Sequence, residues 1–171
     1  MSKFKTFLSY LLPISAACCI YFFLLQNTQL TLLPYAKSLD FLLGYHFFYS
    51  NGSGFEAVGS NFIITKSCSG INLFLSLNLI AIFGFSSSFK TKKSKIAASA
   101  SFLFVSLFFA YFMTLLRIMI SLPFLKSSHF NLIHTAISLL IFFGSCILFY
   151  ELNSKVIKQI KTYTRSNENG K

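Results

Sequence analysis

The chain has 171 residues, of which 54% are hydrophobic and only 11% are charged. Soluble domains carry about 25% charged residues, so this composition excludes an ordinary soluble domain and favours the lipid bilayer. A net charge of +11 would suggest a nucleic-acid partner in a soluble protein. Here the basic residues lie in short clusters beside apolar runs, which is typical of charges that orient membrane proteins. We therefore expect no nucleic-acid partner.

The first apolar run predicts a membrane span over residues 7–25, directly after Lys3 and Lys5. Its length matches the roughly 20 apolar residues that a helical span needs. A cleaved signal peptide has a similar charged start and apolar core, and residues 14–18 faintly resemble a lipoprotein cleavage site. The apolar run continues through residues 19–25, beyond that site. This continuation favours an uncleaved helix.

The next segment, residues 26–70, contains no obvious span. Pro34 discourages a helix from restarting directly after the polar residues 26–28. The apolar stretch 39–48 is only about ten residues long, which suits an interfacial or re-entrant segment rather than a crossing. Residues 51–54 predict a turn, and residues 62–65 predict a short extended stretch.

Three further spans are predicted at residues 71–89, 96–122 and 132–150. A basic loop at residues 90–95 separates the second span from the third, and Pro123 ends the third. Residues 151–171 form a basic tail, which we expect to be partly helical. The prediction is one membrane domain over residues 1–171, an all-α integral membrane protein with four spans and an outer interfacial or re-entrant segment.

The distribution of charge predicts the orientation of these spans. Two Lys precede the first span, four lie in the 90–95 loop and five basic residues lie in the tail, eleven in all on one side. The opposite side holds only Lys37, Lys66 and Lys126, with Arg117 near its boundary. Basic residues accumulate in cytoplasmic loops. We therefore expect both termini to lie in the cytoplasm, with the chain in the cell inner membrane.

Three residues with reactive or charged side chains come to the predicted outer side on separate segments. Cys68 precedes the second span, and His134 begins the fourth. Arg117 lies 21 residues beyond Ile96, about 31 Å along a helix, and so at the outer end of the third span. The sequence thereby predicts a thiol, a guanidinium and an imidazole at the same depth in the membrane, on its outer side.

Cys68 is the candidate nucleophile. It is followed by Ser69 and Gly70 and then by a helix, and a helix N-terminus favours a thiolate. Gly70 would also let the backbone approach a substrate closely. The alternative is a buried, unreactive cysteine, the interpretation that we give to three cysteines within apolar runs. These are Cys18, Cys19 and Cys146.

Arg117 is the only arginine in or between the predicted spans, on the side that basic residues avoid. An arginine near a helix end can extend to the lipid headgroups without any further role. The functional alternative is that it stabilises an oxyanion or binds a substrate carbonyl or carboxylate. Thr114, three residues earlier, shares its helix face.

His134 is a candidate general base for the thiol and then acid for the leaving amine. His129 competes with it because it is also outward, and His46 is a third candidate, so position alone does not choose among them. A metal site is not predicted, because paired Cys or His motifs are absent and only Asp40 and Glu56 are acidic on the outer side. We expect no cofactor, since the chain has no glycine-rich phosphate loop.

Several of these residues together resemble a known family. Ser67-Cys68-Ser69-Gly70-Ile71-Asn72, then Leu116-Arg117-Ile118, then His134 at the start of the last span, are similar to the exosortase/archaeosortase family. The order and spacing match a short member of the exosortase K type over roughly residues 60 to 150. The chain departs from the family at Thr114, where Asn is frequent, and at Ser138, where Gly is common.

The resemblance implies a multispanning cysteine transpeptidase or protease. Its substrates would be exported proteins with a C-terminal sorting signal, made of a short motif, a transmembrane helix and a basic tail. Cys68 would be the nucleophile, Arg117 the electrophilic stabiliser and His134 the base. The supporting candidates are Ser69, Gly70, Asn72, Thr114 and His129.

Two other functions fit the same sequence. One is a non-catalytic polytopic membrane protein, such as an assembly factor or a transporter subunit. The other is an endopeptidase that hydrolyses without transfer. Besides substrate proteins, the expected partner is the lipid bilayer. The sequence specifies no substrate motif, acceptor nucleophile or oligomeric state.

Overall fold

The structure is a computed structural model that describes residues 2–59, 62–85, 88–89 and 92–169. Within these residues it contains five α-helices, which are α1 (Ser2–Gln26), α2 (Thr28–Leu43), α3 (Ile71–Phe85), α4 (Lys92–Ser121) and α5 (Phe130–Asn169). Two 3-10 turns, η1 (Lys66–Cys68) and η3 (Leu122–Phe124), join them. The predicted helical architecture is confirmed, with one addition, a small sheet between α2 and η1.

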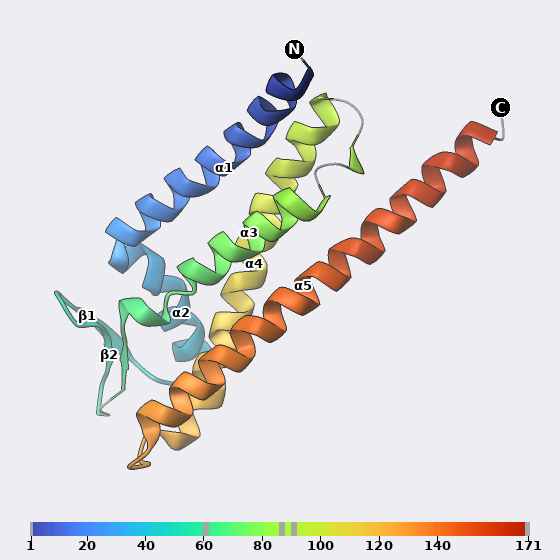
Figure 1. Ribbon diagram of the computed structural model, residues 1–171. Helices are drawn as coiled ribbons and strands as arrows, with labels where there is room; N and C mark the ends of the chain where they lie inside the picture. The colour runs from blue at the N-terminus through green and yellow to red at the C-terminus, as the bar shows by residue number, and fades with distance from the viewer. Residues whose placement is uncertain (1, 60–61, 86–87, 90–91, 170–171) are drawn as a thin grey trace.

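The helices α1, α3, α4 and α5 run lengthwise, with α3 in contact with the other three (Figure 1). The first turns of α1, the end of α3, the start of α4 and the end of α5 lie at one end of the molecule. The sheet and the connection from α4 to α5 lie at the other end. Segments predicted on opposite sides of a membrane are therefore at opposite ends of the structure.

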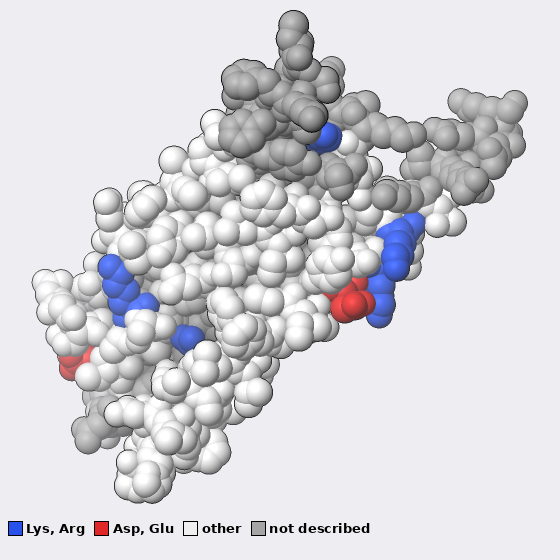
Figure 2. Space-filling view, viewed as in Figure 1, with Lys and Arg blue, Asp and Glu red and all other residues white. Residues whose placement is uncertain are grey.

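Three helical segments are long and apolar enough to cross a membrane, namely Lys66–Phe85, Ser94–Phe124 and Phe130–Ile160. A fourth is present if Pro13–Gln26 and Thr28–Leu43, which meet at 79°, count as one broken span. Large apolar side chains are exposed along the helices, for example Leu140 at 74% and Phe104 at 75%. Figure 2 shows the charged side chains of the visible face gathered toward its two ends, with an uncharged band between them. These features are consistent with a membrane protein.

The segment after residue 26 differs from the prediction, because a helix restarts at Thr28 and includes Pro34. Side chains bond two carbonyl groups beside the break. Asn27 Nδ2 donates to Phe23 O at 2.8 Å, in addition to the backbone bond from Asn27 N, and Thr31 Oγ1 donates to Leu24 O at 2.8 Å. A break whose carbonyls are bonded can be abrupt, so α2 follows at once. The residues of the predicted segment 39–48 divide between the end of α2 and the first strand, so its bounds differ from the prediction, and its interfacial or re-entrant placement stays a prediction.

The sheet has three antiparallel strands, β1 (Phe47–Ser50), β2 (Gly54–Ala57) and β3 (Ile63–Ile64). The turn predicted at 51–54 joins β1 to β2, and the extended stretch predicted at 62–65 supplies β3. One face of the sheet is buried against α2 through Phe55, Ala57 and Ile64. The contact fixes the chain that leads into η1 and hence into Cys68.

The boundaries of the predicted spans also change. The second predicted span corresponds to α3, which ends at Phe85, and the rest of the range 71–89 lies partly outside the described residues. The third predicted span corresponds to α4, which begins at Lys92, so residues 92–95 of the predicted 90–95 loop are helical. The fourth does not end at residue 150, because α5 continues through the basic tail to Asn169. Residues 90–91 and 170–171 lie outside the described part of the chain.

Candidate functional site

The loop that carries Cys68 is held by short-range backbone bonds. Cys68 N donates to Thr65 O at 2.9 Å, and Ser69 N donates to Lys66 O at 3.1 Å, which forms the η1 turn. Phe74 N then donates to Gly70 O at 2.9 Å, the first bond of α3. Two residues therefore separate Cys68 from the following helix.

Gly70 has a conformation and surroundings that favour glycine. Its φ is +66°, the left-handed region that side chains with a Cβ disfavour. A Cβ at this position would overlap Thr114 Oγ1 and lie 3.0 Å from Thr114 Cβ. Gly70 therefore lies close against Thr114 on α4, a residue that is itself only 2% exposed, and the predicted approach to a substrate stays a prediction.

Tyr35 is a site residue that the sequence did not indicate. Its hydroxyl donates to Ser69 O at 2.9 Å, and its side chain is 5% exposed. The ring packs against that of Tyr111 on α4, with ring centroids 5.1 Å apart. A buried residue on α2 thus holds the peptide directly after Cys68. Tyr35 and Ser69 are 34 positions apart in the sequence, so no local pattern pairs them.

Cys68 and His134 line the same cleft, of about 320 Å³, which we call the thiol cleft. Its walls come from β3 and η1 on one side and from the ends of α4 and α5 on the other. Cys68 is half-buried, with Thr65 Oγ1 at 3.9 Å from its Sγ. The structure thereby brings together the thiol and the imidazole predicted from separate segments.

His134 is oriented by Ser121, a second residue missed by the sequence reasoning. Ser121 Oγ donates to Arg117 O at 2.8 Å, and His134 Nδ1 lies 3.1 Å from the same Oγ. When the serine hydrogen goes to this carbonyl, Oγ accepts from Nδ1–H, and the neutral imidazole in that arrangement has its lone pair on Nε2. The i, i+4 spacing of Ser121 from Arg117 was the available signal.

Arg117 lies beside the thiol cleft but does not line it. Its Nη2 donates to Ser67 O at 3.2 Å, and its buried Nε has no hydrogen-bond partner among the described residues. Arg117 lines a second cavity of about 520 Å³, which we call the arginine cavity. Ser67 lines both the arginine cavity and the thiol cleft, so it forms part of the wall between them.

The N-terminal turn of α3 belongs to the arginine cavity rather than to the thiol cleft. Ile71, Asn72 and Leu73 line the arginine cavity, whereas Cys68 does not. Asn72 Oδ1 accepts a hydrogen bond from Tyr21 at 3.2 Å. Cys68 lines a space formed with β3, α4 and α5, and the predicted proximity of its sulfur to the N-terminus of α3 stays a prediction.

The remaining candidates lie away from the thiol cleft. His129 is exposed before α5, where its backbone N donates to Ser127 Oγ at 3.2 Å. His46 is paired with Asp40 at 3.1 Å, and neither histidine lines the cleft. Cys18, Cys19 and Cys146 are free thiols, as Cys68 is. Geometry thus distinguishes His134 from its competitors, which position in the sequence did not.

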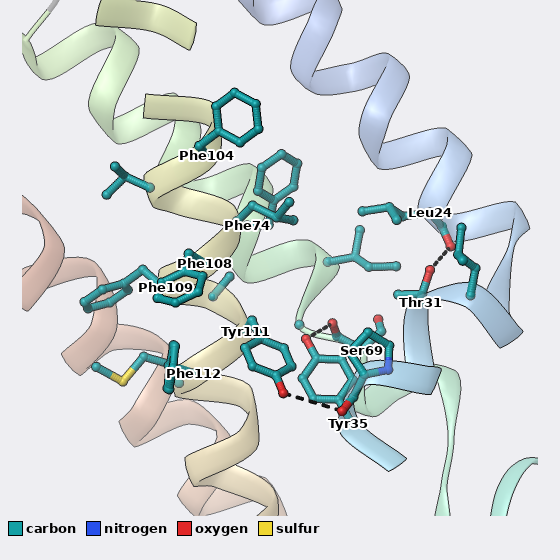
Figure 3. Close-up of a pocket in the computed structure, with 18 residues that line it drawn as sticks. Leu24, Thr31, Tyr35, Ser69, Phe74, Phe104, Phe108, Phe109, Tyr111 and Phe112 are labelled. Atoms are coloured by element: carbon teal, nitrogen blue, oxygen red, sulfur yellow. Dashed lines mark hydrogen bonds between the residues drawn. The ribbon is translucent and has the colours of Figure 1, made fainter. Parts of the chain in front are cut away.

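A third space, which we call the apolar groove, runs between α2 and α4 and has a volume of about 900 Å³. Figure 3 shows its wall of phenylalanines on α3 and α4, with Tyr35 and Ser69 at one end. Ser69 and Gly70 line both this groove and the arginine cavity. The loop around Cys68 therefore lies where all three spaces meet.

Within the described residues, no group of three or more His, Cys, Asp or Glu side chains is arranged to hold a metal ion. No known protein family, curated protein or solved structure matches the chain.

Proposed function

We propose that the protein is a membrane-embedded cysteine peptidase with transpeptidase activity, of the kind that the exosortase-like residues imply. The observation that supports it most is the thiol cleft, which Cys68 and His134 line together. A cysteine nucleophile requires a nearby base whose orientation is set by a third group. Ser121 is that group here, because it leaves the Nε2 lone pair of His134 as the proton acceptor.

In the proposed reaction, His134 Nε2 takes the proton of Cys68, and the thiolate attacks the scissile carbonyl of the substrate. The tetrahedral intermediate collapses to a thioester as His134 gives its proton to the leaving amine. Water or an acceptor amine then attacks the thioester and restores the thiol. Arg117 does not line the thiol cleft, so its proposed role as the electrophilic stabiliser is indirect: it donates to Ser67 O and places a positive charge on the far side of the Cys68 loop, where the charge favours a developing oxyanion through its electric field.

The proposed substrates are exported proteins with a C-terminal sorting signal that contains a transmembrane helix. The apolar groove supports this choice, since its apolar walls end at Ser69 and Gly70, next to Cys68. In the proposed topology, four spans cross the inner membrane, and α1 provides the first. In this proposal both termini are cytoplasmic and the thiol cleft opens on the outer side, because eleven basic residues belong to the segments of the sequence that are predicted to be cytoplasmic.

The first experiment measures labelling of Cys68 in intact cells with a membrane-impermeant maleimide. Cys18, Cys19 and Cys146 are replaced by Ala, so that Cys68 is the one remaining thiol. We expect labelling from outside, slowed by His134→Ala and less strongly by Ser121→Ala. His129→Ala is the matched control and should leave the rate unchanged, since His129 lies outside the cleft. Labelling that is absent, or indifferent to His134, would contradict the proposal.

The second experiment distinguishes an enzyme from a non-catalytic membrane protein. Cells carrying Cys68→Ser are compared with wild type for the processing of proteins that end in an apolar helix and a basic tail. The proposal expects loss of processing, and an acceptor group on the wild-type product would identify transfer rather than hydrolysis. Unchanged processing with Cys68→Ser would favour the assembly factor or transporter subunit instead.

A further inference from the structure

The arginine cavity contains two cations that have no anionic partner. Arg117 lines it from α4, and Lys66 lines it from η1. None of the residues lining the cavity is acidic, and no described carboxylate is ion-paired with either cation. A half-buried guanidinium and a neighbouring ammonium repel each other unless an anion lies between them.

Hydrogen-bond donors converge on the same space. Arg117 has five N–H donors, of which one is bonded to Ser67 O, and its buried Nε has no partner among the described residues. The N–H groups of Ile71, Asn72 and Leu73 precede the first bond of α3, which runs from Phe74 N to Gly70 O. Asn72 Oδ1 is already occupied by Tyr21, so its amide nitrogen remains as a donor.

Much of the remaining lining of the cavity is apolar. Leu25, Leu139 and Phe142 line it from α1 and α5, which also contribute Tyr21 and Ser138. A ligand that fills the whole space therefore needs an anionic group joined to an apolar part. Phosphate fits the anionic part, since Arg, Lys and helix N-terminal amides all bind it. Basic pockets between membrane helices bind the headgroups of anionic lipids for the same reason.

We propose that the arginine cavity binds a phosphate group, held by Arg117, Lys66 and the N-terminal amides of α3. The apolar walls of the cavity favour a phospholipid as its source, with inorganic phosphate as the alternative. Arg117 has a role in both proposals, but Lys66 belongs only to this cavity and Cys68 and His134 line only the other cleft, so Lys66 variants test the binding separately from the peptidase chemistry. The cavity contacts that cleft only through Ser67.

The test uses the full chain purified in a neutral detergent, in the Cys68→Ser form so that no reaction intervenes. Retention of phosphatidylglycerol is measured by native mass spectrometry, and stabilisation by inorganic phosphate is measured as a shift in melting temperature. Lys66→Gln is the main variant because Lys66 is exposed and its replacement leaves the fold intact. Arg117→Gln is the second variant, and Lys37→Gln is the control, an exposed lysine outside the cavity.

We expect Lys66→Gln and Arg117→Gln each to weaken binding by about tenfold, with no change in Lys37→Gln. Selective retention of the lipid identifies a headgroup site, and a response to inorganic phosphate alone identifies a free-phosphate site. The proposal is overturned if the unsubstituted cavity binds neither probe. The proposal is also overturned if the Lys66→Gln variant binds phosphatidylglycerol and inorganic phosphate as tightly as the Lys37→Gln control does.

Discussion

The molecule has two hydrophobic cores of different construction. The cap core joins α2, the sheet and the end of α4, and Cys68 packs against it. The bundle core joins α3, α4 and α5 along their lengths, through residues such as Phe74, Phe102 and Phe149. Tyr35, a member of the cap core, also bonds the backbone at Ser69. The bundle core instead consists of apolar contacts with one buried polar pair, Asn78 and Ser106.

The two cores should therefore differ in how well they tolerate substitutions. Apolar packing between long helices is tolerant, because similar side chains of similar volume fill the same space. A loop held by a left-handed glycine and a buried hydroxyl has few alternatives. We therefore expect substitutions beside the Cys68 loop to cost more than equally small ones in the bundle.

The largest effect is expected from Gly70→Ala. The new Cβ would occupy a left-handed conformation and overlap Thr114 Oγ1, so the free energy of unfolding should fall by roughly 2–5 kcal/mol. Gly44→Ala is the matched control, with φ +69° and no atom within 4 Å of the added Cβ. It should cost only about 1–2 kcal/mol. Unfolding by SDS in mixed micelles measures both, and equal losses would remove the role given to Thr114.

Tyr35→Phe should have an intermediate effect. It removes the bond to Ser69 O and leaves a buried carbonyl unpaired, at a cost of about 1–3 kcal/mol. The rate of Cys68 labelling should change with it, because the bonded peptide follows the thiol directly. Tyr45→Phe serves as the comparison, since the Tyr45 ring packs on the cap core without a described hydroxyl bond. If the two variants label alike, Tyr35 stabilises the cap core without positioning Cys68.

The smallest effect is expected in the bundle, from Ser106→Ala. Ser106 Oγ accepts from Asn78 Nδ2 at 3.3 Å, and both side chains are fully buried. Polar contacts between membrane helices average about 0.6 kcal/mol, so the loss should be of that order. Ser101→Ala, an exposed serine on the same helix, should change nothing measurable. A loss larger than that of Tyr35→Phe would reverse the ranking of the two cores.

The lengthwise helices were predictable because apolar runs of sufficient length encode them directly. The runs beginning near Ile71, Ile96 and Leu132 correspond to α3, α4 and α5. Their ends were less predictable, since Lys92 and the basic tail continue helices whose apolar pattern has stopped. Helix continuation there depends on backbone propensity, which hydropathy does not report.

The sequence indicated that the three candidate residues share one end of the molecule, but not that two separate cavities divide them. Depth alone indicated that Cys68, Arg117 and His134 lie at one end, because each is near the end of an apolar run. The side of Ser67 on which Arg117 lies depends on the rotation of α4 about its axis. The restart of α2 at Thr28 was missed because Asn27 and Thr31 bond the carbonyls of the break through their side chains. Tyr35 could not be inferred without that helix.

The uninterrupted length of α5 links the imidazole to the basic tail as one rigid rod. His134 and Lys155 lie 21 residues apart on this helix, about 32 Å along its axis. In the proposed topology, the lysines would lie among the headgroups on one side of the bilayer and would set the height of the imidazole on the other. Deleting one residue between them would turn His134 by about 100° and move it by about 1.5 Å. If His134 is the base, the proposal therefore requires a fixed number of residues between it and the lysines.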